Sequence, residues 1–434
     1  MGQAPSTSDT KAHGHLASSF NTNFKTFKLE SKVISEETIS LIQAHLQKGD
    51  FQKTVSIINT ALKDLENAPL NIAVTGESGA GKSTFINALR GIGHEEDGAA
   101  ATGVVETTAE RTSYIHPKFP KVTIWDLPGI GTTTFKAETY LHEMKFHEYD
   151  FFIIISSTRF RENDAQLAKA IEKMKKNFYF VRTKVDSDLR DQAKCRPKAY
   201  DEDEVLQQIR NDCLKNLEKA DVGTGRVFLI SSVEVAQFDF PELESTLLKE
   251  LPAHKRYIFM QCLRNVTEAT IEWRRDSLKQ TIWLEALKRG AAAAIPMMRL
   301  FNSKVEELEK TLTFCRVFFG LDDESLENMA QDLSLSVEEL KTSIKSPHLL
   351  SAEPDESTGD KLMKYLEKIF ATTGGLIATG LYFGKSYYLQ NYFLDTVVND
   401  AKILLRRRDL FENDVDSQQG CKMERIRQPA CDWS

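Results

Sequence analysis

The spacing of hydrophobic residues changes twice along this chain of 434 residues. Near the start, apolar residues recur at helical spacing within residues 20–27, 39–46 and 51–65. Stripes of this kind are typical of amphipathic helices, which need a partner surface to bury their apolar face. We therefore expect two or three helices over residues 19–66, preceded by a flexible polar leader at residues 1–18.

Short apolar runs without polar alternation replace this pattern between residues 67 and 250. The runs are LNIAVTG (70–76), VTIWD (122–126), DFFIIIS (150–156), FYFVRTK (178–184) and RVFLISS (226–232). Helical stretches such as residues 164–176 separate them. Continuous apolar strands that alternate with helices are typical of a sheet covered on both faces. The pattern predicts an α/β domain over residues 67–250, with a mixed, mostly parallel sheet.

Helical spacing returns over residues 251–411, and residues 412–434 form a polar tail that we expect to lack regular structure. The C-terminal helices and the N-terminal helices can bury their apolar stripes against each other, which predicts an all-α domain built from both segments. The longest uncharged run, Ile369–Gly384, contains four glycines. It is shorter than the roughly 20 apolar residues that span a membrane, so we expect no transmembrane helix.

Composition narrows the functional classes. The chain is 41% hydrophobic and 27% charged with a net charge of −7, which is typical of a soluble globular protein and argues against a general nucleic-acid binder. Six cysteines lie far apart without a Cys-x-x-Cys pair. This distribution fits a reduced cytoplasmic protein without a disulfide framework or a zinc site.

The sequence GESGAGKS at residues 76–83 matches a phosphate-binding loop between a predicted strand and a predicted helix. Its glycines let backbone N–H groups face phosphates at the positive end of the helix. We expect Lys82 to reach the β- and γ-phosphates and Ser83 to bind Mg²⁺. The predicted nucleotide contacts here are Gly76, Glu77, Ser78, Gly79, Ala80, Gly81, Lys82, Ser83 and Thr84.

A second motif, WDLPGIG, begins at the end of the strand at residues 122–126. We expect Asp126 to hold Mg²⁺ and the backbone of Gly129 to sense the γ-phosphate. Small signalling GTPases carry a water-orienting glutamine directly after that glycine. This chain has Ile130 there, which can neither donate nor accept a side-chain hydrogen bond. A water-positioning group must therefore come from another segment.

The sequence TKVD, residues 183–186, ends the strand at residues 178–184 and predicts the base site. The Asp186 carboxylate can accept hydrogen bonds from N1–H and the exocyclic amine of guanine, a donor pair that adenine lacks. Lys184 is expected to lie along the base, and Ser231 and Ser232 to complete the pocket. Thr183 replaces the commoner asparagine and loses one bracing amide. The motifs in this order predict a P-loop GTPase domain that binds GTP and GDP.

Together the motifs GESGAGKS, WDLPGIG, FYFVRTKVDSDL and LPAHKR, with helices on both sides, resemble the interferon-inducible immunity-related GTPases, the p47 family. With Lys82 in its phosphate loop, the chain resembles the GKS effector-type branch of the family, whereas a regulatory branch has methionine at this position. The resemblance implies a dynamin-like GTPase that forms homodimers and higher oligomers on intracellular membranes and disrupts pathogen-containing vacuoles. Related regulatory GTPases of the family are implied partners.

The resemblance also implies a source for the missing catalytic group. The family uses a glutamate near the γ-phosphate, which matches Glu106 in the glycine- and threonine-rich segment 98–111. Hydroxyls of this segment can join Mg²⁺, the candidates being Thr102, Thr107 and Thr108. In the family, the region matching residues 156–164 meets a second GTPase domain. We predict that Arg159 acts across a homodimer face, as an arginine supplied in trans does.

Membrane attachment has two sequence indications. MGQAPS matches the pattern for N-myristoylation at Gly2. A single myristoyl chain anchors a protein only marginally, so a second signal is needed. The apolar stripe within residues 364–383 either supplies that signal or packs in the helical core.

Two other functional classes remain open from the sequence. In the first, GTP fixes a conformation that partners recognise, and hydrolysis is incidental. In the second, the chain is a P-loop metabolic kinase, which has no need of the TKVD motif. GTPase rates measured against protein concentration, with and without Glu106→Ala, separate the first class from a self-assembling enzyme, and Asp186→Asn separates the second.

Overall fold

In the computed structural model, the chain is described at residues 27–28, 31–102, 110–129, 137–158, 161–219, 221–222, 226–263, 266–293, 305–349, 364 and 381–426. The described residues fall into two compact units. Residues 63–265 make an α/β unit, and residues before 63 join residues after 265 in a helical unit.

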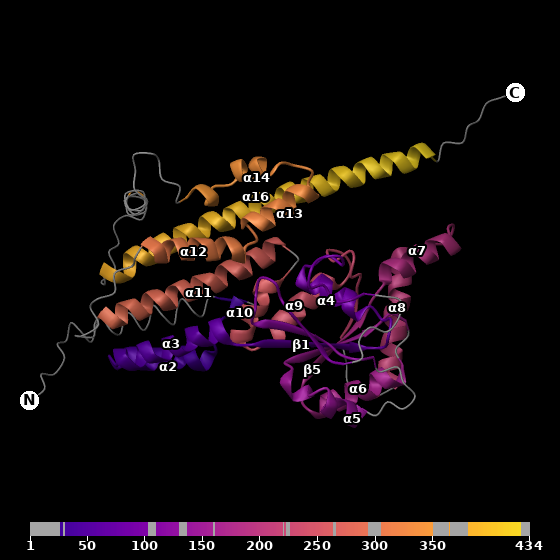
Figure 1. Cartoon of the computed structure of the whole chain (residues 1–434), viewed down its shortest axis with the longest axis horizontal. Coiled ribbons are helices and arrows are strands. Elements are labelled where there is room, and N and C mark those ends of the chain that lie inside the picture. The colour runs from indigo at the N-terminus through magenta and orange to yellow at the C-terminus, as the bar shows by residue number, and fades with distance from the viewer. Residues whose placement is uncertain are drawn as a thin grey trace, which may run out of the picture. The chain divides into compact units, whose positions relative to one another are not determined.

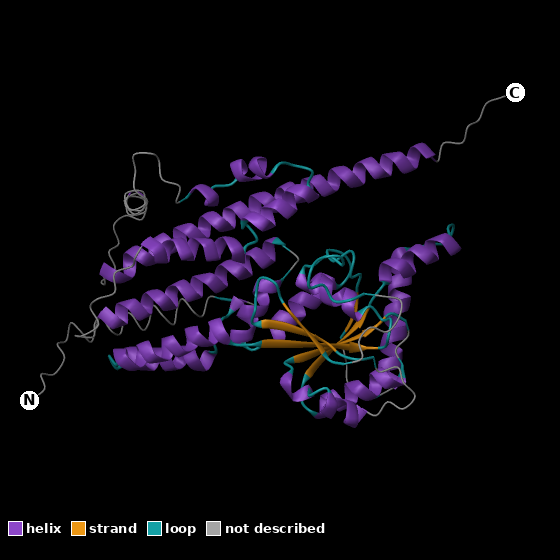
Figure 2. Ribbon diagram, in the orientation of Figure 1, coloured by secondary structure: helices purple, strands orange, loops and turns teal. Residues whose placement is uncertain are grey.

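A six-stranded sheet forms the centre of the α/β unit (Figures 1 and 2). Its strands are β1 (Leu70–Gly76), β2 (Thr112–Ile115), β3 (Val122–Asp126), β4 (Phe151–Ser156), β5 (Asn177–Arg182) and β6 (Val227–Leu229). Their order across the sheet is β2-β3-β1-β4-β5-β6, and every neighbouring pair is parallel except β2 with β3. The prediction of a mixed, mostly parallel sheet is confirmed.

Helices cover both faces of this sheet because the side chains of its central strands are buried on both sides. On one face lie α5 (Ala137–Glu143), α6 (Glu162–Lys173), α7 (Val185–Cys195) and α8 (Glu202–Lys219), and on the other α4 (Lys82–Arg90), α9 (Phe240–Glu250) and α10 (Ala253–Cys262) (Figure 1). Phe152 stacks on Phe146 with ring centroids 4.5 Å apart, whereas the preceding Phe151 meets Phe259 of α10 at 6.3 Å. Successive side chains of β4 thus point to opposite faces of the sheet and pack against the two layers of helices.

The helical unit combines the two ends of the chain, as the sequence predicts. Its elements are α2 (Glu36–Gln47), most of α3 (Phe51–Asn67), α11 (Glu268–Ala293), α12 (Val305–Phe318), α13 (Asp323–Asp332), α14 (Val337–Ser343), the 3₁₀ turn η3 (Ser346–His348) and α16 (Leu381–Ile426). Helices α11, α12 and α16 run side by side in Figure 1. Ion pairs Lys402–Glu272 and Arg275–Asp395 join α16 to α11. The backbone N–H of Val33 donates to Gln280 of α11 at 3.2 Å.

Two segment boundaries differ from the sequence expectation. Helix α10 follows the expected boundary at residue 250 but belongs to the α/β unit. The buried Arg256 holds it there by donating to the carbonyl oxygens of Leu248 and Leu251, each at 2.9 Å. Residues 412–426 continue α16 and are not an irregular tail. Polarity alone does not end a helix, and the first proline after residue 411 is Pro429.

None of the helices in the described ranges is long and apolar enough to cross a membrane. Most of the uncharged run Ile369–Gly384, and of the stripe within residues 364–383, lies outside the described residues.

Candidate functional site

The loop between β1 and α4 lies where the sequence predicts a phosphate-binding loop. Three of its glycines adopt backbone conformations that side chains rarely reach, with φ of 140° at Gly76, 74° at Gly79 and 91° at Gly81. At Gly76 an added Cβ would lie 2.0 Å from the carbonyl oxygen of Ile155. This glycine therefore lets β1 pass close to β4 just before the loop turns into the helix.

Lys82 and Ser83 open helix α4 inside this loop. The buried Lys82 ammonium donates to the carbonyl oxygens of Gly76 at 3.3 Å and Glu77 at 2.9 Å. Its charge is thereby held over the loop, where phosphate oxygens would bind. The Ser83 hydroxyl donates to Asp126 Oδ2 at 2.9 Å.

A hydroxyl and a carboxylate this close form an oxygen donor pair of the kind that Mg²⁺ binds together with substrate phosphates. Ser83 begins α4, whereas Asp126 ends β3, so two separate motifs of the sequence meet at one point. These residues fit a magnesium ion. The Ser83 oxygen could ligate the ion through a lone pair while its proton still donates to Asp126.

The base motif is tied directly to the phosphate loop. The buried Thr183 hydroxyl donates to the carbonyl oxygen of Ala80 at 2.6 Å. Lys184, with a φ of 60°, donates from its ammonium to the carbonyl oxygen of Gly79 at 3.0 Å. Thr183 therefore braces the loop with its hydroxyl, although it has no amide.

Asp186 and Ser231 follow the neighbouring strands β5 and β6 of the sheet. Asp186 is in the first turn of α7, and its residue is 8% exposed. The backbone N–H of Val185 donates to the carbonyl oxygen of Ile230 at 3.3 Å, which joins the two loops. The Ser231 hydroxyl accepts from the backbone N–H groups of Val233 and Glu234, so this turn is shaped by a buried serine.

Some predicted site residues lie outside the described residues: Gly2, Glu106, Thr107, Thr108, Ile130 and Arg159. Thr102 is described and exposed, and Gly129 is partly buried just after the end of β3. The roles of all these residues stay predictions.

Sequence reasoning did not select Asp164, which lies beside the phosphate loop. Its carboxyl is buried, and Oδ2 accepts from the backbone N–H of Arg161 at 3.1 Å. Among the described residues, Asp164 Oδ1 has no hydrogen-bond partner. Burial raises the pKa of Asp164 to about 7, and the nearby Glu77 carboxylate acts in the same direction, whereas Arg161 and Lys82 oppose it. The sequence signal for this residue was only its place in SSTRFREND.

Two further arginines shape the base side of the site and were also missed. Arg182, at the end of β5, pairs with Asp188 at 2.6 Å and donates to the carbonyl oxygen of Ser157. Arg190, one turn after Asp186 on α7, forms an ion pair with the Asp186 carboxylate. The four-residue spacing of Asp186 and Arg190 on a helix was the only signal available in the sequence.

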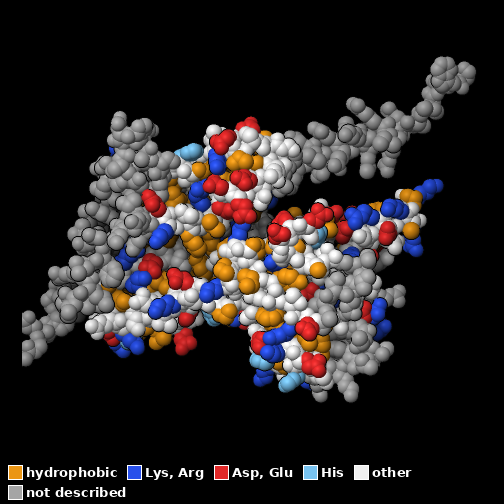
Figure 3. All heavy atoms as spheres, in the orientation of Figure 1, with side chains coloured by type: hydrophobic (Ala, Val, Ile, Leu, Met, Phe, Trp, Pro, Cys, Tyr) orange, Lys and Arg blue, Asp and Glu red, His pale blue; other side chains and the backbone are white. Residues whose placement is uncertain are grey.

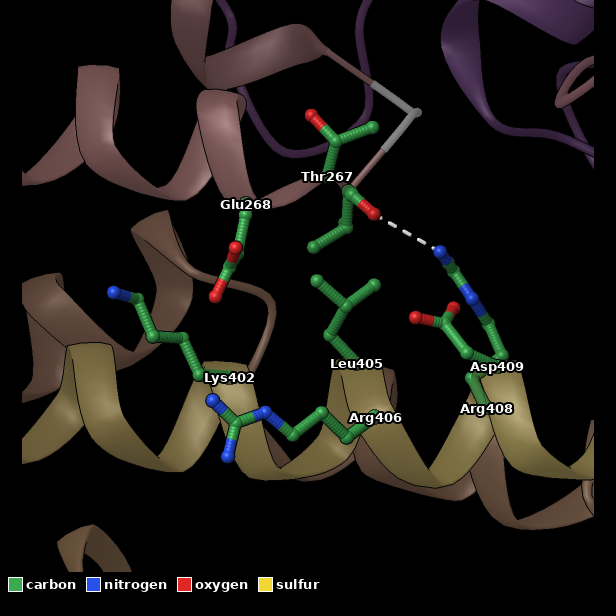
Figure 4. A pocket seen from close by; sticks show the side chains of 8 residues that line it. Thr267, Glu268, Lys402, Leu405, Arg406, Arg408 and Asp409 are labelled. Carbon is green, nitrogen blue, oxygen red and sulfur yellow. Dashed lines mark hydrogen bonds between the residues drawn. The ribbon is translucent and has the colours of Figure 1, made fainter.

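A pocket of about 480 Å³ lies in the helical unit between the start of α11 and α16 (Figure 4). Two of its charged lining side chains bind other groups of the helical unit. Lys402 binds Glu272, and the Arg408 guanidinium donates to the carbonyl oxygen of Val266 at 2.9 Å. On the face shown in Figure 3, acidic and basic side chains are interspersed. We assign the pocket no function.

Comparison with known proteins shows the family of the chain. The family model described as Interferon-inducible GTPase matches residues 35–408. Interferon-gamma-inducible GTPase 10 of Mus musculus is 66% identical over 418 residues, covering 96% of this chain and all of the relative. T-cell-specific guanine nucleotide triphosphate-binding protein 2 of the same species is 56% identical over 92% of this chain and 96% of its own length.

Interferon-inducible GTPase 1 of Mus musculus is 46% identical over 94% of this chain and 98% of its own length. Among solved structures, Era in complex with MgGDPNP and a 16S ribosomal RNA fragment matches 50% of this chain and 68% of its own. Its TM-score of 0.30 and 19% identity are too low to support an argument. The family match and the high identity over nearly the full length are decisive: the chain belongs to the interferon-inducible GTPases, which are immunity-related enzymes that hydrolyse GTP.

Proposed function

We propose that this GTPase is activated by homodimerisation, self-assembles in its GTP state on intracellular membranes, and disrupts pathogen-containing vacuoles in cell-autonomous immunity. In this proposal it works as a dynamin-like enzyme, and GDP is the product that lets the assembly come apart. Family membership supports the immune role. The geometry around the phosphate loop supports activation by a second molecule.

Phosphate binding begins with groups already in place. Lys82 would exchange its contacts with Gly76 and Glu77 for the β- and γ-phosphate oxygens. Backbone N–H groups at the start of α4 would face the same anion. Ser83 and Asp126 would hold Mg²⁺, with Thr102 or Thr108 as a candidate further hydroxyl. When bound, Mg²⁺ neutralises part of the phosphate charge.

The attacking water needs a residue other than Ile130. We assign its positioning to Glu106, whose carboxylate can accept a proton or a hydrogen bond from water. A carboxylate close to a triphosphate is electrostatically disfavoured unless cations lie nearby. Arg159, supplied by a second molecule, would provide such a cation during hydrolysis.

The observation that carries this proposal is the ion pair between Arg161 and Glu77, with Nη1 and Oε1 3.0 Å apart. Glu77 belongs to the phosphate loop, and Arg161 follows Arg159 by two residues. The loop after β4 therefore lies against the phosphate loop at its exposed side, since the Arg161 side chain is 62% exposed. A second molecule docking there would bring its own Arg159 to the same place.

Mixing two inactive variants tests whether Arg159 acts in trans. Arg159→Ala keeps Glu106 but cannot donate the arginine, whereas Glu106→Ala donates the arginine but cannot position water. Each variant alone should hydrolyse GTP at least about tenfold more slowly than wild type. An equimolar mixture should recover activity in proportion to mixed dimers. Lys173→Ala, which removes an exposed charge from α6, is the matched control and should retain wild-type turnover.

Turnover per molecule should also rise with protein concentration in wild type. A mixture no faster than its components would contradict action in trans. Turnover that stays constant over a hundredfold concentration range, together with unchanged turnover in Glu106→Ala, would favour a GTP-dependent binding switch instead.

Membrane attachment is supported by the myristoylation motif and the apolar stripe within residues 364–383. Flotation of myristoylated and Gly2→Ala protein with neutral and anionic vesicles, in GDP or a non-hydrolysable GTP analogue, tests it. We expect the GTP analogue to increase vesicle binding of the myristoylated form, because assembly multiplies weak anchors. If myristoylated and Gly2→Ala protein bind vesicles equally in both nucleotides, neither the myristoyl chain nor GTP-dependent assembly attaches the protein to membranes.

Base recognition is assigned to Asp186. Asp186→Asn exchanges one acceptor for a donor, so it should weaken guanine-nucleotide binding and favour xanthine nucleotides, which offer the complementary pattern. Competition between GDP and xanthosine diphosphate measures the change. Unaltered preference for guanine would place base recognition elsewhere.

A further inference from the structure

The carboxylate of Asp186 is already bound by a neighbouring side chain. The Arg190 guanidinium donates from Nη2 to Asp186 Oδ2, and the same nitrogen donates to the Ser187 hydroxyl oxygen at 3.1 Å. The Asp186 side chain is 9% exposed, whereas that of Arg190 is 59% exposed. A solvent-exposed cation therefore binds a buried carboxylate.

Arg190 also reaches toward the opposite wall of the base site. Its Nη1 lies 3.9 Å from Oε1 of Glu234, in the turn that follows Ser231 and Ser232. The guanidinium thus lies between the end of β5, which carries the base motif, and the turn after β6. A purine edge that approaches Asp186 between these two loops has to pass the same place.

We propose that Arg190 is a latch that competes with guanine for the Asp186 carboxylate and thereby sets guanine-nucleotide affinity and exchange. The proposal rests on the assignment of Asp186 as the guanine reader. It adds a regulating residue outside the phosphate-loop, WDLPGIG and TKVD motifs.

Competition follows from the geometry of the two partners. Guanine recognition uses two adjacent donors, which require both oxygens of one carboxylate in the plane of the base. A guanidinium hydrogen bond to Oδ2 is charge-assisted and fixes that carboxylate in another pairing. The base can bind only in the fraction of molecules whose latch is open, which raises the apparent dissociation constant.

Opening the latch requires little rearrangement. The Arg190 side chain is mostly solvent-exposed, so it can leave Asp186 without unpacking the core. Glu234 offers the displaced guanidinium a second carboxylate nearby. Because the guanidinium has to move from Asp186 toward Glu234 first, a nucleotide enters more slowly than it would enter a pocket without the latch. Entry is not blocked.

Binding of a fluorescent GDP analogue to purified full-length protein tests the latch. Arg190→Ala should lower the dissociation constant by roughly three- to fivefold, the upper part of the range expected when a partly exposed ion pair is removed. Most of the change should be in the association rate. Lys194→Ala removes the same charge from the exposed far end of α7 and should stay within about twofold of wild type.

A double-variant cycle shows whether the effect passes through Asp186. In an Asp186→Asn background, Arg190→Ala should leave GDP affinity unchanged, because the neutral amide no longer holds the guanidinium. An equally large gain in that background would show that Arg190 acts by general charge, which contradicts the latch. Thermal unfolding of each variant confirms that the proteins compared are folded.

Other outcomes are equally decisive. Weaker GDP binding by Arg190→Ala would mean that the arginine supports the base, and affinity within twofold of wild type would show that it does not compete. If Asp186→Asn alone leaves guanine binding unchanged, the assignment of the reader fails, independently of the result for Arg190.

Discussion

The hydroxyl of Thr183 donates a 2.6 Å hydrogen bond to the carbonyl oxygen of Ala80, and both residues are buried. This contact links the end of β5 to the phosphate loop, although the two residues are 103 positions apart. The base motif and the phosphate loop are therefore braced against each other before a nucleotide spans them.

Thr183→Val should weaken this brace without changing the volume of the side chain. A buried carbonyl left without its donor costs about 1–3 kcal/mol. We expect a matching loss in the free energy of unfolding and weaker binding of both GDP and GTP. Thr183→Ser keeps the hydroxyl and is the control. Chemical denaturation and nucleotide titration measure the two effects, and a Val variant as stable as the Ser variant would contradict the prediction.

Gly76→Ala should be severely destabilising. The new Cβ would lie 2.0 Å from the carbonyl oxygen of Ile155, in a backbone conformation with a φ of 140°. We expect a loss of about 3 kcal/mol or more in the free energy of unfolding. Gly79→Ala, in the same loop, meets no heavy atom within 4 Å and should cost only about 1–2 kcal/mol of left-handed strain. Equal losses would refute this assignment of the close approach.

Asp164 should make stability depend on pH in an unusual direction. Burial raises its pKa from 3.8 to about 7 in the folded protein. Between these values the folded state holds a proton that the unfolded chain has lost. The stabilising contribution of the protonated group is therefore complete below pH 4 and falls as pH rises toward 7, by an amount on the order of 4 kcal/mol.

Asp164→Asn removes this titration while it keeps the shape of the side chain. The variant should lose less stability than wild type between pH 5 and pH 8, as measured by thermal unfolding at each pH. Asp191→Asn, which changes an exposed acid on α7, should retain the wild-type pH dependence. Parallel pH profiles for wild type and Asp164→Asn would show that the buried carboxyl does not ionise in this range.

Asp400→Ala should destabilise the helical unit. The buried Asp400 carboxylate accepts from the backbone N–H groups of Lys345 at 3.0 Å and Ser346 at 2.6 Å, and so fixes η3 to α16. Hydrogen bonds to a charged acceptor contribute about 1.5–3 kcal/mol each, so we expect a loss of about 3–6 kcal/mol for the two donors. Asn399→Ala, at an exposed neighbouring position, is the control. Similar unfolding curves for the two variants would count against the prediction.

Most strands that the sequence predicted are buried on both faces, and burial imposes a continuous apolar run; β3, with alternating buried and half-buried positions, is the exception. Strand β2 was not predicted, since Thr112–Ile115 pairs along one edge and its side chains are mostly exposed. Its pairing depends on the position of β3, which no local pattern encodes. The glycine and lysine positions of the phosphate loop were predictable because backbone conformation and charge restrict those positions to few residue types.

The ion pairs around the site could not be predicted in the same way. Arg161 meets Glu77, and Arg190 meets Asp186, because the fold brings their elements or turns together. Charged residues at these positions are equally compatible with solvent contacts. Asp164 looks like an ordinary helix-start acid in the sequence, whereas its pKa is raised by burial beside the loop and by the nearby Glu77 carboxylate.

The hydrogen bond from Val33 to Gln280 joins residues 247 positions apart. During synthesis, the N-terminal helices emerge first and wait while the whole α/β unit is translated. At about 5–20 residues per second, their partner helix α11 follows roughly 12–50 s later. For that interval the apolar residues of α3 that pack on α11 in the folded unit have no such partner surface, so correct folding of the N-terminal helices has to await the synthesis of α11.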